Sequence, residues 1–169
     1  NRKHPTILQA IKNVNALYKN RGFRLMTGHT DNEFEPMRGN LLDLGIELNV
    51  VSNDEHVPEI ERSNRTVKER TRCIYNQLPF KKMPARMIIE MVNHSVFWLN
   101  AFIPDDGISQ KLSPQTLILG THVDYEKHCQ LEFGTYVQTH EAHDNSMLPC
   151  TTGAIALRPT GNEQGGYYF

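Results

Sequence analysis

The stretch from Pro58 to Gln77 reads PEIERSNRTVKERTRCIYNQ, and its spacing of apolar residues predicts a long helix that begins at Pro58 or Glu59. In a helix, positions three and four residues apart lie on one face. The face that we expect to be buried, with two polar interruptions, consists of Ile60, Asn64, Val67, Thr71 and Ile74. The neighbouring face begins with an acid and continues with cations, in the order Glu61, Arg65, Lys68 and Arg72. The helix therefore divides into a packing stripe and a charged stripe.

Positive charge is concentrated in this helix and just after it. Residues 62–86 carry a net charge of +7, and the rest of the chain carries −8, within a total of −1. The basic residues of this region are Arg62, Arg65, Lys68, Arg70, Arg72, Lys81, Lys82 and Arg86, opposed by Glu69. Such a local concentration is typical of a surface that contacts phosphates. The alternative is a solvated helix face, because Glu61 and Arg65 form a favourable pair four residues apart.

Composition limits the class of protein. The chain has 169 residues, 38% of them hydrophobic and 22% charged, which suits one sizeable core or a truncated domain with a small appendix. No apolar run approaches the roughly 18 residues of a membrane span, and no signal peptide opens the chain. Three scattered cysteines argue against a disulfide framework and indicate the cytoplasm or nucleus. We expect both ends to be cut from a longer polyprotein.

Periodicity and glycine or proline boundaries predict the other elements. Helices are expected from residue 5 to a stop at Gly22, and at 34–44, 85–102 and 113–119. Strands are expected at 23–30, 46–50, 135–139, 154–157 and 166–169. Helices and strands alternate in the first part of the chain, whereas short strands dominate the second part. The predicted fold class is therefore α/β, followed by a small β module.

Two carboxylates are candidates for binding a divalent metal. Asp31 directly follows the predicted strand 23–30, and Glu61 lies in the first turn of the long helix, where the helix dipole stabilises an anion. A metal held by carboxylates beside cationic side chains suits phosphoryl transfer, because charge develops on the attacking and leaving oxygens. Glu59 competes with Glu61, but it lies about 200° round the helix from it. The two therefore cannot both face Asp31.

Short motifs around these residues resemble those of the integrase core of copia-type retrotransposons, in the ribonuclease-H-like superfamily. Residues 30–34, TDNEF, resemble the family's "DNG-x-(E)F" signature at its second acidic residue. Residues 61–66, ERSNRT, resemble the "ER-x-NRT" signature at its catalytic glutamate. Further similarities follow in the same order at residues 91–100, 112–120, 133–137 and 153–167. The resemblance thus extends over nearly the whole chain.

This resemblance implies a partial ribonuclease-H-like catalytic core in residues 1–112. Residues 113–169 would form a linker helix and an incomplete, small β-barrel-like module. Asp31 and Glu61 would be catalytic ligands of Mg²⁺ or Mn²⁺ in the complete domain, which joins element DNA to target DNA. The residues that would contact DNA are Arg62, Asn64, Arg65, Lys68 and Arg72. The complete protein would form a homo-oligomer, act in the cytoplasm and nucleus, and require no membrane.

The sequence departs from the family at four places. The family's leading Asp lies on a strand upstream of the helix that opens this chain, so no position here corresponds to it. Glu33 replaces the usual glycine after Asp-Asn, and residues 53–58 replace the flexible "P-x-x-NG" loop. Between Asp31 and Glu61 there are 29 residues, where two-metal sites of this type have roughly thirty-five. We therefore expect no strand transfer from this stretch alone.

Other metal sites and catalytic groups are less well supported. His140, His143 and Cys150, with His128 and Cys129 nearby, fit no closed four-ligand zinc pattern, so loop histidines are the preferred interpretation.

Four further features have simple structural interpretations. His56 could line the mouth of an active site, but a solvated loop histidine is the simpler expectation. Cys73 lacks a basic partner for nucleophilic chemistry, so we expect it to pack. Phe97 and Trp98 lie on an apolar helix and are expected in the core. Residues 161–166 predict a β-turn, because no strand-to-helix glycine fingerprint is present.

Two further functions compete with integration. The chain could be a catalytically inactive remnant that binds DNA or self-associates, or a protein-interaction domain that uses the helix at 85–102. Salt dependence discriminates between them, because phosphate binding weakens steeply as salt rises.

Overall fold

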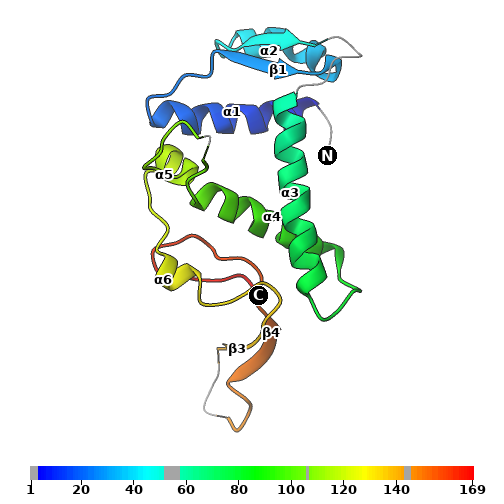
Figure 1. The fold of residues 1–169 in the computed structure, drawn as a ribbon, viewed down its shortest axis with the longest axis vertical. Helices are drawn as coiled ribbons and strands as arrows, with labels where there is room; N and C mark the ends of the chain where they lie inside the picture. The colour runs from blue at the N-terminus through cyan, green and yellow to red at the C-terminus, as the bar shows by residue number, and fades with distance from the viewer. Residues whose placement is uncertain (1–3, 52–57, 106, 143–145) are drawn as a thin grey trace. The chain divides into compact units, whose positions relative to one another are not determined.

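The computed structural model describes residues 4–51, 58–105, 107–142 and 146–169 (Figure 1). Its elements are α1 (His4–Asn20), β1 (Thr27–Thr30), the 3-10 helix η1 (Asn32–Met37), α2 (Arg38–Leu42), β2 (Glu47–Val50), α3 (Pro58–Gln77), α4 (Ala85–Ala101), α5 (Pro114–Leu119), α6 (Tyr125–His128), β3 (Tyr136–His140) and β4 (Thr151–Ile155). The predicted mixture of helices and strands is confirmed, with small sheets. Within the described ranges, no helix is long and apolar enough to cross a membrane.

The chain divides into two compact units. Unit 1 contains residues 1–65 and 115–120, and unit 2 contains residues 66–114 and 121–169. Helix α3 contributes its first half to unit 1 and its second half to unit 2. The domain boundary at residue 113 was predicted from the resemblance to a family. It stays a prediction.

Unit 1 is built on two parallel strands. β1 pairs with β2 in parallel, from Thr27 opposite Glu47 to Thr30 opposite Val50. Its core consists of Met37, Leu41, Ile46 and Leu48, against which Ile7, Leu8 and Ile11 of α1 pack. The observed β1 is shorter than the predicted strand at 23–30, because its partner β2 has four residues with which to pair.

Unit 1 also shows how local signals end a helix. Gly22, two residues beyond α1, has a φ of 80°, and Gly45, beyond α2, has a φ of 78°. Side chains avoid this left-handed backbone region, whereas glycine adopts it without strain. Gly22 supports the predicted end of α1. The helix predicted at 34–44 is instead the 3-10 helix η1 followed by α2, which ends at Leu42.

Unit 2 is centred on α4 and the second half of α3. Its core contains Leu78, Met87, Met91 and Phe133, with Ile74 and Leu157 packed against it. The two helices also meet through hydroxyl groups, because Thr71 Oγ1 lies 3.1 Å from Ser95 Oγ. Each hydroxyl also lies within hydrogen-bond distance of a carbonyl oxygen four residues earlier in its own helix, so one hydroxyl can donate to the other while the second donates to its own carbonyl. These small polar side chains therefore remain satisfied in the helix contact.

The β module of unit 2 is an antiparallel hairpin. β3 pairs with β4, from Tyr136 opposite Ile155 to His140 opposite Thr151. β4 therefore begins before the predicted strand at 154–157, because its extent is set by its partner. The strand expected at 166–169 is not present in this fully described segment, where Tyr167 forms a single bridge to Pro159. The short helix α6 was not anticipated from the sequence.

A half-buried ion pair joins α4 to the C-terminal segment of unit 2. Arg158 Nε lies 2.6 Å from Glu90 Oε2, and the two side chains are 24% and 19% exposed, respectively. The Arg158 guanidinium also lies 4.2 Å from the centre of the Tyr168 ring. Because water screens this pair only partly, we expect it to stabilise unit 2 more than a surface pair would.

Replacing Glu90 by Gln should lower the free energy of unfolding by about 1–2 kcal/mol, because a half-buried guanidinium loses its anion. The matched control is Glu35→Gln, which breaks the pair with Arg38 at 2.7 Å, where both side chains are nearly half exposed. This exposed pair should leave the midpoint of urea unfolding unchanged. Equal midpoints for the two variants would contradict a stabilising role for Glu90.

Candidate nucleic-acid interface and two adjoining hollows

The charged stripe of α3 lies along one side of the helix. At 100° per residue, Arg65, Lys68 and Arg72 fall within about 60° of arc together with Glu61. All four side chains are exposed. Arg62 and Asn64, which were also predicted to contact DNA, are exposed as well. The helix thus presents these cations where a polyanion could reach them.

The neighbouring stripe of α3 is less covered than the sequence predicted. Val67, Thr71 and Ile74 are half-buried, but Ile60 is 49% exposed and Asn64 is also exposed. The expectation of burial was therefore wrong for the first two positions of the stripe. The reason is that the contact with α4 and the core of unit 2 involves Thr71 and Ile74, in the second half of the helix.

One cation of the basic region has a structural role. Lys81 Nζ lies 3.3 Å from each of the backbone carbonyl oxygens of Tyr75, Asn76 and Leu78, at the C-terminal end of α3. It also lies 5.2 Å from the centre of the Tyr75 ring. A cation at this position satisfies carbonyls that lack helical partners and opposes the negative end of the helix dipole. The charge count of the sequence did not show that Lys81 has a structural role, whereas the cations of the stripe are exposed.

The two predicted metal ligands lie at the expected places in the chain. Asp31 is exposed and follows β1 directly, and its Oδ1 accepts a hydrogen bond from the backbone N–H of Glu33 at 3.2 Å. Asp31 is thus the N-cap of η1, a role that short acidic side chains commonly take. Glu61 is exposed in the first turn of α3. The metal site that the two carboxylates would share stays a prediction.

Metal-binding clusters are not present in the described part of the chain. No group of three or more His, Cys, Asp or Glu side chains there could hold a metal ion. His128, expected as a loop histidine, instead ends α6, and its side chain is buried with Nδ1 2.8 Å from the Asp124 carbonyl oxygen. His56, His143 and most of the loop at 53–58 lie outside the described residues.

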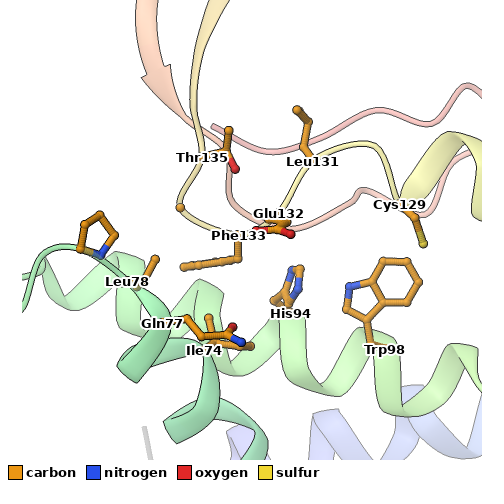
Figure 2. A pocket seen from close by; sticks show the side chains of 12 residues that line it. Ile74, Gln77, Leu78, His94, Trp98, Cys129, Leu131, Glu132, Phe133 and Thr135 are labelled. Atoms are coloured by element: carbon orange, nitrogen blue, oxygen red, sulfur yellow. The ribbon is translucent and has the colours of Figure 1, made fainter.

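A hollow of about 630 Å³ opens in unit 2, and we call it the His94 hollow. Figure 2 shows His94 and Trp98 on α4 opposite the segment that carries Glu132 and Phe133. The His94 ring meets the edge of the Phe133 ring at a centroid distance of 5.3 Å. Ile74 and Gln77 of α3 complete one side. The hollow is lined by both apolar and polar groups, as small-molecule sites often are.

His94 is the most perturbed group of this hollow. Burial lowers the pKa of His94 to about 4, from 6.5, because the charged imidazolium loses hydration there. Its Nδ1 is buried and meets no hydrogen-bond partner among the described residues. His94 was not predicted as a site residue, although its spacing of four residues from Trp98 places both on one face of α4.

A second hollow, of about 710 Å³, shares His94 and Trp98 with the first, and we call it the Arg70 hollow. Arg70 and Cys73 of α3 contribute to its wall, and Phe102 lies at the end of α4. The sequence analysis placed Phe97 and Trp98 in the core and gave Cys73 a packing role. In the structure Trp98 is half-buried between two hollows, and Cys73 is exposed.

Comparison with known proteins adds no family to this description. No protein-family model and no curated protein matches the sequence. The function is therefore argued from the residues themselves.

The pKa of His94 predicts a pH-dependent stability. Between pH 6.5 and about 4 the unfolded chain binds a proton at His94 that the folded chain does not bind. The free energy of unfolding should therefore fall as the pH is lowered through this window. At about 1.4 kcal/mol per pKa unit, and allowing for the partial exposure of the ring, the total loss is roughly 2 kcal/mol.

Urea unfolding at pH 7 and pH 4.5 would measure this loss. His94→Gln should remove most of it, whereas His140→Gln, on the exposed hairpin, should retain the pH dependence of the parent chain. An undiminished loss in His94→Gln would show that other groups control the acid sensitivity.

Proposed function

We propose that this chain is part of a copia-type integrase core with a ribonuclease-H-like fold, and that it contacts DNA phosphates through the charged stripe of α3. The observation that carries this proposal is the stripe itself. Helix α3 runs without interruption over 20 residues, and Arg65, Lys68 and Arg72 share one exposed side behind Glu61.

The dimensions of the stripe suit a nucleic-acid backbone. With a rise of 1.5 Å per residue, Arg65 and Arg72 are separated by about 10 Å along the helix axis. This distance corresponds to roughly three steps of 3.4 Å along one DNA strand. Lys81 interacts with backbone carbonyls at the end of α3, so its charge serves the fold. Phosphate binding is therefore better explained by the cations of the stripe than by the total charge of the basic region.

The order of elements supports the catalytic part of the proposal. Asp31 follows the first of two parallel strands, and the helix that carries Glu61 is the next described element after the second strand. Carboxylate oxygens are the donors that Mg²⁺ prefers, and both side chains are exposed. We propose that Asp31 and Glu61 hold Mg²⁺ or Mn²⁺ in the complete domain.

Each group in this proposal has a separate task. A bound metal would stabilise the negative charge that develops on the attacking and leaving oxygens. Arg65, Lys68 and Arg72 would contact the DNA phosphates, and Asn64 would support the site. Self-association and action in the cytoplasm and nucleus belong to the same proposal.

A catalytically inactive DNA-binding remnant is the second candidate. It needs the exposed cations of α3 but not the carboxylates. Two measurements therefore separate the candidates, one on DNA binding and one on metal binding.

Binding of duplex DNA to this chain should weaken steeply as salt rises, because each neutralised phosphate releases counterions. Lys68→Ala should lower the slope of log K against log salt concentration by about one unit. The control is Lys12→Ala, an exposed lysine of α1, which should leave the slope unchanged. Equal slopes for all three proteins would contradict phosphate binding by the stripe.

Metal binding can be measured with Mn²⁺, whose free form is counted by electron paramagnetic resonance. In a longer polypeptide that carries this sequence, Asp31→Asn and Glu61→Gln should each weaken Mn²⁺ binding by about tenfold or more, since even changes outside the ligand shell can cost that much. Glu59→Gln is the matched control, because it lies on the same helix about 200° away. The control variant should bind Mn²⁺ as the parent chain does.

In a longer polypeptide that carries this sequence, Glu61→Gln should abolish metal-dependent DNA joining. Joining at the unchanged rate in that variant would remove Glu61 from the proposed site. Loss of joining with unchanged DNA binding would distinguish the integrase from the inactive remnant.

A further inference from the structure

Three aromatic rings form a stacked ladder on unit 2. The rings of Trp98 and Phe102 lie 5.5 Å apart with an interplanar angle of 25°. The rings of Phe102 and Tyr125 also lie 5.5 Å apart and are nearly parallel, at 9°. The Tyr125 hydroxyl donates a hydrogen bond of 2.9 Å to the Ala101 carbonyl oxygen, which fixes that end of the ladder.

The ladder is accessible rather than sealed in the core. Phe102 is 53% exposed and Tyr125 is 44% exposed. Trp98 is half-buried. Core aromatic side chains bury most of their surface, so a stack in which two of the three rings remain this open does not maximise burial. Stacked and exposed rings are instead what a surface needs in order to receive another flat aromatic group.

The ladder borders the Arg70 hollow. Trp98 and Phe102 both line this space of about 710 Å³, which lies within the size range of ligand sites. Arg70 of α3 lines it as well and is exposed. Gln77 and Asp105 add an amide and a carboxylate to the wall. The hollow thus combines flat aromatic walls, one cation, and groups that can hydrogen-bond to the edge of a base.

We propose that the Arg70 hollow binds an unpaired base of single-stranded nucleic acid, held against the aromatic wall that Trp98 and Phe102 form, with the flanking phosphate at Arg70. This inference rests on the proposed function, because it assigns single-stranded nucleic acid to a second surface of α3. Aromatic side chains stack on any base, and arginine contributes through its charge and its planar group. Asp105 would accept a hydrogen bond from an N–H group of the base.

The proposed single-strand site is distinct from the charged stripe. Arg70 lies two positions from both Lys68 and Arg72, so it is turned by about 200° from each of them. Duplex phosphates and an unpaired base would thus contact different faces of the same helix. A substitution on one face can therefore be tested without altering the other.

Trp98 is the only tryptophan of the chain, so its fluorescence reports on the two hollows that it lines, and the variants at Arg70 and Phe102 assign the response to the Arg70 hollow. The full chain is titrated with a short oligodeoxythymidine, and separately with a duplex of the same length. Single-stranded DNA should quench the emission in a saturable way, and duplex DNA should bind without comparable quenching. Binding of each DNA is also followed by the anisotropy of a labelled oligonucleotide.

Variants assign the binding to individual residues. Phe102→Leu and Arg70→Gln should each raise the dissociation constant for oligodeoxythymidine by about tenfold, since loss of stacking on one aromatic ring has effects of that size. Lys68→Gln should instead weaken duplex binding more than single-strand binding. Arg70 is exposed, so Arg70→Gln tests the site without disturbing the core.

The outcomes separate this inference from the proposed function. Single-strand binding that leaves Trp98 emission unchanged, or that Phe102→Leu and Arg70→Gln do not weaken, would overturn the inference while leaving duplex binding by the stripe intact. Quenching by a proline-rich peptide and not by oligodeoxythymidine would assign the hollow to a peptide and overturn it as well. Absence of binding to both DNAs would overturn both proposals.

Discussion

The contact between α3 and α4 is the constraint on which the candidate surfaces of unit 2 depend. Thr71 and Ser95 allow the two helices to approach closely, because one hydroxyl can donate across the contact while the other donates to a carbonyl of its own helix. Below this contact, Leu78 packs against Phe133 and the two buried methionines of α4. The reversal between the helices is stabilised by Lys81 on the last carbonyls of α3.

This contact divides the surface of α3 among several roles. A helix advances by about 100° per residue, so a covered stripe leaves two flanks available. One flank carries Arg65, Lys68 and Arg72, and the other turns Arg70 and Cys73 toward the Arg70 hollow. One side of this basic helix would thus pack in unit 2, and its two flanks would form different contact surfaces. The total charge of the helix does not reveal this division.

Local signals allowed the long helices to be predicted well. Pro58 and Gln77 bound α3 as expected, and α4 ends one residue before the predicted end. Strands were predicted less well, because a strand extends only as far as its partner pairs with it. β1 lost the first four of its predicted residues for that reason, and the expected strand at 166–169 is reduced to one bridge.

The sequence by itself determined where the helices lie and which charges share a face of α3, because helical hydrogen bonds and the helical period act within a few residues. The placement of Asp31 after a strand and of Glu61 in a first turn was available in the same way. Only the tertiary structure decided that Lys81 caps a helix, that His94 loses its hydration, and that Tyr125 stacks on Phe102. Such properties arise from packing between groups that are separated along the chain, and no local pattern encodes them.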